Sequence, residues 1–383
     1  MPISSKLTIG IVGAGIAGLT LAAALRRFDI EAVIYEQAPR FSRVGAAIQL
    51  TPNAVQVLRG LGIEKYLRAR SFLPDVGYNR DWQTGEITFL HPMGKQTEER
   101  YGAPDLSMHR AELQDALLSL VPAQTIRFGR RLMGLDWVAD GVRLAFADGE
   151  NDVVDALVGA DGIHSIVRAS VVGEEPLRVT GQVAYRAVYR TENLTREIDD
   201  RVKWWGPDRH IVTYKIDPRR DELYFIASTP EPDFKTESWA APGDLSVLLA
   251  AYDGFHPDAR LILESAPFVH KWAMIEREPL EGWTAERTIL IGDAAHPMLP
   301  YMAQGAGAAM EDAVVLARCL QSSDRESINE AFHTCDRIRR PRTTKIQLDA
   351  RRNVWMKTAA DTNADRIYDY NAWSVPLRQQ AEP

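Results

Sequence analysis

The first long apolar run of the chain predicts a strand and a helix joined by a glycine turn. Residues Leu7 to Leu25, LTIGIVGAGIAGLTLAAAL, carry no charge over 19 positions. The run containing Ile9, Ile11 and Val12 is typical of a buried parallel strand, and LTLAAALRR predicts the following helix. A stretch of this length also imitates a signal peptide or a membrane span. Its four glycines at phosphate-turn spacing favour a soluble fold, and we expect a cytoplasmic protein.

The pattern changes several times further along the chain. EAVIYEQ predicts a second strand ending on Glu36, and helices are expected to begin near Pro52 and Arg110. GVRLAFADGE and DVVDALVGADG resemble a hairpin that returns to the main sheet and ends on Asp161. From residue 181 to about 228, period-two alternation predicts a different, mostly antiparallel sheet. TILIGD then predicts a return to an apolar strand, and an Arg-rich helical region follows.

These changes predict an α/β fold with a Rossmann-like dinucleotide domain, an inserted β-sheet domain and C-terminal helices. A chain of 383 residues is too long for one compact core. The expected boundaries are 1–75, 105–178 and 280–325 for the dinucleotide domain, 76–104 and 179–279 for the β-rich substrate domain, and 326–383 for the helical region.

Composition excludes several classes of partner. The chain is 45% hydrophobic and 25% charged, as globular proteins are, and its net charge of −7 predicts no binding to nucleic acid or anionic membranes. Cys319 and Cys335 are interpreted as structural thiols of a reducing cytosol. The eight histidines are scattered without ligand spacing, so we expect no metal site. The oligomeric state stays open.

Three glycines after the first strand predict a turn that binds a pyrophosphate. Gly13 allows the tight turn, Gly15 lets backbone amides approach the phosphates, and Gly18 lets helix and strand pack closely. The helix N-terminus adds partial positive charge. Glu36, 23 residues after Gly13, lies where an acid accepts hydrogen bonds from an adenosine ribose. The arrangement predicts a dinucleotide but does not separate FAD from NAD.

A second candidate site follows the last apolar strand, in LIGDAAHPMLPYMAQGAGAAMEDA. Asp293 is expected to end that strand at the carboxyl edge of the sheet, where open α/β sheets bind ligands. Small residues from Ala303 to Ala309 would let the backbone approach a ring. The helix starting near Gly305 would point its positive end at the ligand.

Together the motifs GAGIAG at 13–18, GADGIHSIVR at 159–168 and GDAAHP at 292–297 resemble those of the single-component flavoprotein aromatic hydroxylases. The resemblance covers nearly the whole chain. It implies FAD as cofactor, NADH or NADPH and O2 as co-substrates, and hydroxylation through a flavin C4a-hydroperoxide. The single nucleotide fingerprint fits, because NAD(P)H binds transiently in this family without its own Rossmann domain.

The resemblance also implies the FAD contacts. Asp161 would belong to a motif shared between FAD and NAD(P)H functions, and Asp293 would bind the ribityl chain. Arg110 would contact the ribityl–pyrophosphate region, and Arg43 would approach the phosphates. The full expected set is Gly13, Gly15, Ala17, Gly18, Glu36, Gln37, Arg43, Arg110, Leu132, Asp161, Asp293, Gly305 and Ala306.

The substrate implied by the resemblance is a small hydroxylated aromatic or pyridine carboxylic acid. Electrophilic hydroxylation needs a proton acceptor or relay at the ring hydroxyl. His210 and Tyr214 lie four apart on a predicted strand, on one face and roughly 13 Å apart. The resemblance assigns Tyr214 to deprotonating or anchoring the hydroxyl and His210 to substrate binding. From the residues alone, packing roles for both stay open.

The pocket sequence is similar to that of family members acting on 6-hydroxynicotinate, with two departures. Gln49, expected among the catalytic residues, replaces a histidine and cannot take a proton near neutral pH. Tyr301 replaces another histidine in the proline loop. Arg186 is a candidate carboxylate ligand, with an exposed sheet arginine as the alternative.

The substrate therefore stays open between several types. A 6-hydroxynicotinate-like acid, with or without decarboxylation to a dihydroxypyridine, stands beside salicylate 1-hydroxylase and 3-hydroxybenzoate 6-hydroxylase activities. Two rival classes also remain. A NAD-dependent dehydrogenase would need only the glycine turn, and a flavin-loaded redox or binding protein would lack hydroxylase turnover.

Overall fold

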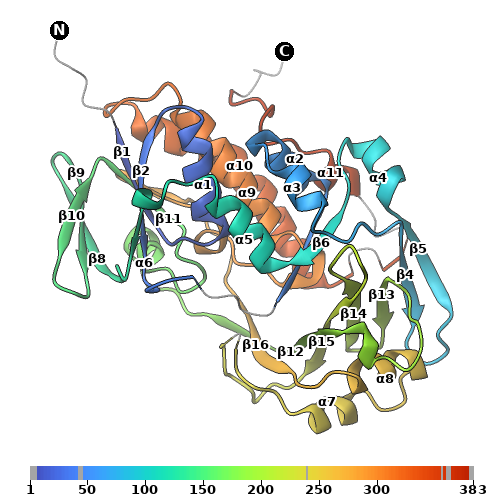
Figure 1. The fold of residues 1–383 in the computed structure, drawn as a ribbon. Helices are drawn as coiled ribbons and strands as arrows, with labels where there is room; N and C mark the ends of the chain where they lie inside the picture. Colours follow the sequence, from blue (N-terminus) through green and yellow to red (C-terminus); the bar gives the residue numbers. More distant parts are fainter. Residues whose placement is uncertain (1–6, 42–45, 239, 355–356, 359–363, 379–383) are drawn as a thin grey trace.

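A computed structural model describes residues 7–41, 46–238, 240–354, 357–358 and 364–378. The dinucleotide part is built on a six-stranded sheet in the order β17-β18-β11-β1-β2-β7, parallel except for the edge strand β17 (Figure 1). Its strands are β1 (Thr8–Val12), β2 (Glu31–Glu36), β7 (Ile126–Phe128), β11 (Ala156–Gly159), β17 (Thr284–Ala285) and β18 (Thr288–Leu290).

The long apolar run at the start of the chain forms the centre of this sheet and its first helix. β1 is followed by the glycine turn and by α1 (Ile16–Arg26), a helix rich in Ala and Leu, both strong helix formers. Among the described residues, none of the helices combines the length and apolar character needed to cross a membrane.

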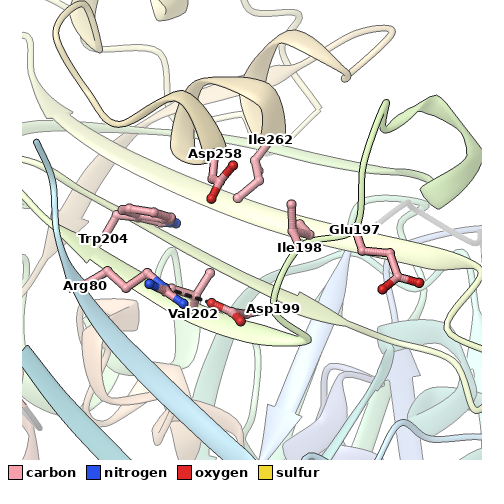
Figure 2. Close-up of a pocket in the computed structure, with 8 residues that line it drawn as sticks. All are labelled: Arg80, Glu197, Ile198, Asp199, Val202, Trp204, Asp258 and Ile262. Atoms are coloured by element: carbon pink, nitrogen blue, oxygen red, sulfur yellow. Dashed lines mark hydrogen bonds and ion pairs between the residues drawn. The ribbon is translucent and has the colours of Figure 1, made fainter. Parts of the chain in front are cut away.

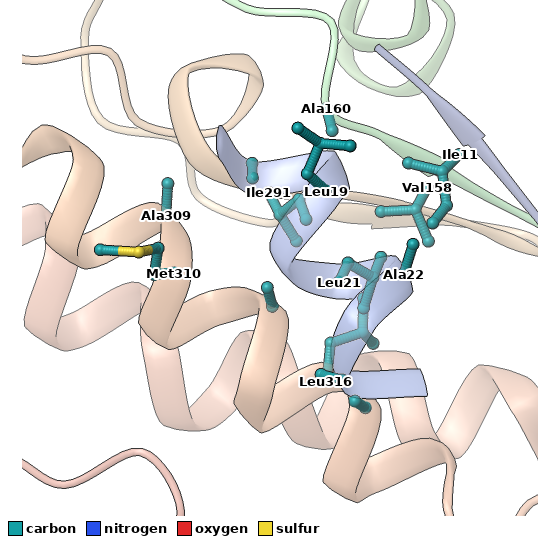
Figure 3. Close-up of a cluster of buried hydrophobic side chains, with 14 of the residues drawn as sticks. Ile11, Leu19, Leu21, Ala22, Val158, Ala160, Ile291, Ala309, Met310 and Leu316 are labelled. Atoms are coloured by element: carbon teal, nitrogen blue, oxygen red, sulfur yellow. The ribbon is translucent and has the colours of Figure 1, made fainter. Parts of the chain in front are cut away.

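The main hydrophobic core lies between the sheet and a layer of helices. Figure 3 shows Leu19 and Leu21 of α1 beside Ile11 and Val158 of the strands and Leu316 of α9. α1 packs on α9 (Gly305–Leu320), and α9 in turn contacts α2 (Pro52–Leu61) and the long α10 (Ile328–Arg352). Helices therefore cover the sheet next to the carboxyl ends of β1 and β18.

A second sheet of seven strands has the order β16-β12-β15-β14-β13-β4-β5 and is antiparallel except between β13 and β4. Its strands are β4 (Val76–Asp81), β5 (Ile87–Pro92), β12 (Arg178–Arg190), β13 (Arg201–Trp205), β14 (His210–Lys215), β15 (Glu222–Pro230) and β16 (His270–Glu276). Alternating side chains give it two faces. Tyr185, Ile211 and Phe225 pack on the outer face, with residues of α7 (Leu245–Ala251) and α8 (Pro257–Glu264). The opposite, inner face includes Trp272 and Met274 and packs against Leu299, Met302 and α10.

Smaller elements complete the structure. The predicted hairpin divides between two sheets: β8 (Leu132–Val138), β9 (Gly141–Phe146) and β10 (Asn151–Val154) form a three-stranded sheet, and β11 joins the main one. β3 (Ala47–Leu50) pairs with β6 (Leu106–His109). The remaining helices are α3 (Glu64–Arg68), α4 (Gly94–Tyr101), α5 (Arg110–Leu118), α6 (Ile166–Val172) and α11 (Ala364–Tyr368), with 3-10 turns η1 (Ala123–Thr125), η2 (Thr191–Asn193), η3 (Gly292–Ala294) and η4 (Pro300–Met302).

The predicted fold class is confirmed, with one local difference. Asp293 was expected to end a strand, but β18 ends at Leu290 and Asp293 lies in the turn η3. Gly292 has φ +59°, and its N–H donates to Asp312 Oδ2 at 3.0 Å instead of to a neighbouring strand. The backbone therefore leaves the sheet before the carboxylate.

Candidate functional site

The glycine turn between β1 and α1 has the geometry of a ligand cradle. Gly13 has φ +100°, and a Cβ there would lie 2.5 Å from the oxygen of Ala160. A Cβ on Gly18 would lie 2.0 Å from the oxygen of Gly13. A Cβ on Gly15, the N-cap of α1, would meet no protein atom within 4 Å. Gly13 and Gly18 are thus required by the protein's own packing, whereas Gly15 borders open space.

This difference gives a prediction that separates ligand binding from folding. Gly15→Val should weaken FAD binding by about 100-fold, because its methyl groups would fill the space where phosphates accept backbone hydrogen bonds worth roughly 1.5–3 kcal/mol each. The melting temperature of the apoprotein should hardly change. Gly18→Ala is the matched control and should lower that melting temperature. FAD titration and thermal unfolding measure both effects; unchanged FAD affinity in Gly15→Val would contradict the placement.

Glu36 lies at the end of β2, directly against this turn. Its Oε2 accepts a hydrogen bond from the Ala14 N–H at 2.8 Å, and its Oε1 accepts one from the Ala38 N–H at 2.8 Å. The neighbouring Gln37 is exposed, and Ala17 is buried in the first turn of α1. The carboxylate is thus held at the edge of the cradle, where the sequence places the adenosine ribose.

Asp161 has a local structural task. Its Oδ1 accepts from the hydroxyl of Ser165 at 2.5 Å, and its Oδ2 accepts from the N–H groups of Ile166 and Val167 at the start of α6. Such contacts satisfy N–H groups that a helix leaves free at its N-terminus. The carboxylate is therefore engaged in capping α6. Its predicted role toward the nucleotides stays a prediction.

Asp293 and Arg110 come together from distant segments. The Asp293 side chain is solvent-accessible, yet desolvation by the surrounding protein raises its pKa, against the opposing charges of His296 and Arg110. Arg110 is exposed at the start of α5. Both side chains thus remain accessible to a ligand.

For the other expected cofactor residues, the structure gives the position but no contact that indicates a role. Gly305 and Ala306 are half-buried in the first turn of α9, whose N-cap Gln304 makes no side-chain capping bond. Leu132, the first residue of β8, is buried in the main core. Arg43 lies outside the described residues. Gly305 and Ala306 thus lie at the start of α9, and Leu132 belongs to the core. The contacts of these residues with FAD stay predictions.

The inner face of the seven-stranded sheet brings the predicted substrate residues together. Arg201 pairs across β13 and β14 with Tyr214, and Trp205 pairs with His210. Since side chains alternate along a strand, Lys203 lies on the same face between these pairs. β3 and the loop before α9 border this face: Ala47 packs with Tyr214 and Tyr224, and the Tyr301 ring lies 5.2 Å from the His210 ring.

Tyr214 is a buried, neutral phenol. Burial raises its pKa well above the usual value, and Tyr224, whose ring lies 5.2 Å away, adds to this, while the positive charge of Arg201 opposes it. A tyrosine in this state donates a hydrogen bond but does not act as a base near neutral pH. Gln49, also buried, accepts a hydrogen bond at 3.4 Å from Arg201 Nη2. This end of the face can therefore bind a ring oxygen or an anion.

His210 lies at the other end and is neutral as well. Burial lowers its pKa well below the usual value, and the charges of Lys203 and Lys357 lower it further. Its Nδ1 lies 2.9 Å from the Ser228 hydroxyl. A neutral imidazole keeps one nitrogen as an acceptor, so His210 can accept a hydrogen bond from a ring hydroxyl.

Arg186 is buried, which removes the alternative of an exposed sheet arginine. It is 2% exposed, and its guanidinium lies 5.2 Å from the centre of the Trp272 ring. Burial lowers its pKa, the charge of Arg110 lowers it further, and Tyr224 opposes this shift. Arg186 thus lies close enough to Arg110, an expected FAD contact, for the two charges to interact.

Three residues of this region were not identified as site residues from the sequence. Arg201 and Lys203 belong to β13, where the motif KWW at 203–205 was the available signal. Asp105, just before β6, is 1% exposed. Desolvation raises its pKa to about 6, although Arg201 and a hydrogen bond from Gln49 oppose this.

Asp105 makes stability depend on pH. Its pKa is about 6 in the folded protein against 3.8 ordinarily, so between these values the folded state holds a proton that the unfolded state has lost. Stability should therefore fall as pH rises from about 4 to 6, by an amount on the order of 3 kcal/mol, and then stay level. Asp105→Asn should remove this component. Urea unfolding across that range measures it; identical pH profiles in both proteins would contradict the prediction.

A pocket of about 270 Å³ lies on the other face of the sheet (Figure 2). Figure 2 shows Val202 and Trp204 of β13 below Asp258 and Ile262 of α8, with Asp199 beside Arg80. Carboxylates dominate its charged lining, so it does not suit an anionic aromatic acid. The two faces of β13 thus differ in charge, and the inner face is the candidate substrate site.

Comparisons with known proteins agree with this geometry. Residues 6–348 match the family described as FAD binding domain. The chain is 37% identical over 375 residues to the 6-hydroxynicotinate 3-monooxygenase of Bordetella bronchiseptica, covering 97% of each chain. It is 38% identical over 352 residues to the 3-amino-4-hydroxybenzoate 2-monooxygenase of Streptomyces cremeus, covering 91% of this chain and 87% of that one.

Solved structures share the fold. The structure of Klebsiella pneumoniae HpxO complexed with FAD and uric acid matches with a TM-score of 0.82 and 27% identity, covering 94% of this chain and 90% of that one. The open space at Gly15 and the accessible side chains of Asp293 and Arg110 fit FAD. The expected cofactor and enzyme class, an FAD-dependent aromatic-ring monooxygenase, are confirmed. The chain therefore belongs to the FAD binding domain family, as one of its flavoprotein monooxygenases.

Proposed function

We propose that the protein uses NAD(P)H and O2 to hydroxylate a small aromatic or pyridine carboxylic acid that carries a ring hydroxyl. The observation that carries this proposal is the inner face of the seven-stranded sheet. Tyr214 and His210 lie there on one strand, opposite cationic β13 and next to the loop that leads into α9. An ionisable ring between the two residues would lie beside the region expected to hold the flavin.

The chain's own residues would bind and orient the substrate. Tyr214, neutral through burial, donates a hydrogen bond to the ring oxygen and so stabilises its deprotonated form. His210, also neutral, accepts a hydrogen bond at the other end of the ring. Tyr301 and the buried inner face exclude water from the ring. Asp293 and Arg110 would hold the ribityl region of FAD, which supplies the oxygen-transfer chemistry when bound.

A substrate of the 6-hydroxynicotinate type is the first candidate, in line with the activity of the Bordetella relative. A hydroxybenzoate is the second, because Gln49 offers an amide but no proton acceptor. The Streptomyces relative, which acts on an amino-hydroxybenzoate, supports this second candidate.

We also propose that the chain divides into the domains expected from its sequence and that the protein is cytoplasmic. The order of sheets and helices along the chain supports this division. The dinucleotide domain comprises 1–75, 105–178 and 280–325, the substrate domain 76–104 and 179–279, and the helical region 326–383. The free thiols Cys319 and Cys335 fit a reducing cytoplasm.

A panel of hydroxybenzoates and hydroxypyridine carboxylates tests the proposal. At least one acid should accelerate NADH or NADPH oxidation and give a product heavier by one oxygen, or one that has lost its carboxyl group and gained a hydroxyl. Mass spectrometry separates the two products. If no acid stimulates oxidation or is hydroxylated, the proposal is wrong and a flavin-loaded redox or binding protein is favoured.

A further inference from the structure

Arg201 occupies a place on the inner face that is shaped around its guanidinium. It is the first residue of β13 and is half-buried. On the neighbouring strand β4, a Cβ on Gly77 would lie 2.3 Å from Arg201 Nη1. Any larger residue at position 77 would displace the guanidinium. The glycine therefore leaves room for a charged group beside Tyr214, the cross-strand partner of Arg201.

The guanidinium forms no ion pair with a carboxylate within the described part of the chain. Arg201 Nη1 lies 3.0 Å from the Met93 sulfur, a weak acceptor, and Nη2 makes the 3.4 Å hydrogen bond to Gln49. Its buried Nε has no hydrogen-bond partner there. The charge of Arg201 acts on the neighbouring carboxyl of Asp105, but the side-chain hydrogen bond of that carboxyl is with Gln49. A charge placed in this way is costly unless a ligand completes its hydrogen bonds.

Lys203 places an amine on the same face as Arg201. Its Nζ lies 3.6 Å from the centre of the Trp205 ring, and Lys357 lies 5.1 Å from the same ring. Burial and the charges of Arg201 and Lys357 depress the pKa of Lys203. No carboxylate of the described residues forms an ion pair with Arg201 or Lys203. The positive charge of this face is thus available to an anion from solution.

Resting on the proposed function, we propose that Arg201 binds the carboxylate of the aromatic substrate, with the amine of Lys203 as a second hydrogen-bond donor of the site. Arg201 suits this role because its planar guanidinium can bind a carboxylate through two hydrogen bonds. Arg186 is the competing candidate. Its guanidinium is already stacked on Trp272 and lies near Arg110, toward the flavin contacts. The carboxylate at Arg201 would fix the ring beside Tyr214.

Binding of an acid and of its neutral carboxamide to the FAD-loaded protein tests this assignment. The ligand is an acid hydroxylated by the wild-type protein, and the change in flavin absorbance on titration gives the Kd. Arg201→Gln should raise the Kd of the acid about 100-fold, since hydrogen bonds to charged groups contribute roughly 1.5–3 kcal/mol. The Kd of the carboxamide should change less than about threefold. Lys203→Met should show a smaller loss with the same preference.

Matched variants exclude a general loss of structure. Arg201→Lys should recover part of the acid affinity, and FAD content and melting temperature verify folding of each variant. Arg80→Gln, on the outer face of the same sheet, should keep the wild-type preference for the acid. Equal losses for acid and carboxamide in Arg201→Gln would overturn the assignment. So would loss of the preference in Arg186→Gln but not in Arg201→Gln. Failure of the proposed function is distinct, because the wild-type protein would then hydroxylate no acid.

Discussion

Tyr214→Phe should lower product formation by about 100-fold or more and leave FAD bound. The substitution removes one hydroxyl from a buried position on the inner face, where the neutral phenol is expected to donate to the ring oxygen of the substrate. Removing one hydrogen-bond donor that stabilises a developing negative charge on oxygen typically costs about 10²–10³-fold in rate. Product formation measured by mass spectrometry, with flavin absorbance as a measure of bound FAD, gives both quantities.

Tyr189→Phe provides the control for Tyr214→Phe. Tyr189 is equally buried in the seven-stranded sheet but belongs to the outer face, where its hydroxyl donates to the oxygen of Ile262 at 2.6 Å. Its loss should affect stability more than turnover. Unchanged turnover in Tyr214→Phe would reject the role assigned to that residue, and equal losses in both variants would show only damage to the sheet.

Arg339→Met should lower the free energy of unfolding by roughly 3–5 kcal/mol, because removing one partner leaves the others charged and buried. Arg339 pairs at 2.7 Å with both Glu311 and Asp312, and all three side chains are 0% exposed. Burial opposes ionisation of Asp312, but the charges of His296 and Arg339 hold its pKa below the usual value. Urea unfolding of the apoprotein measures the change.

The same network holds the turn η3 that carries Asp293, so a second effect is expected. Asp312 Oδ2 accepts from the Gly292 N–H at 3.0 Å and lies 2.5 Å from His296 Nε2, which ties it to the turn that carries Asp293. Arg339→Met should therefore also weaken FAD binding. Arg340→Met is the control: its pair with Asp336 is partly exposed, and its loss should cost less than about 1 kcal/mol. A similarly small effect of Arg339→Met would contradict the account.

The nucleotide cradle was predictable because its requirements are local. Gly13 needs its positive φ, Gly18 approaches the oxygen of Gly13, and Gly15 caps the helix of the same strand–turn–helix unit. Glu36 follows on the next strand. The shared face of His210 and Tyr214 followed from strand periodicity alone. Their predicted roles remain to be measured.

The rest of the site depends on contacts that no local pattern contains. Arg201 is distinguished by a partner strand, by Gly77 and by the lack of an ion pair among the described residues, and each of these needs the folded sheet. In the sequence Asp105 does not differ from an ordinary loop acid, and only the structure shows that it is buried. The position of Asp293 beyond its strand is set by Asp312 on α9, 19 residues further along the chain.

A crystal structure of the protein with FAD and a hydroxylated acid identified by the panel tests the central claim most directly. The account predicts the flavin ring beside Asp293 and the start of α9, and the acid on the inner face between Tyr214 and His210. Its carboxylate should contact Arg201. An acid bound instead in the outer pocket of Figure 2, beside Asp199 and Asp258, would contradict the account.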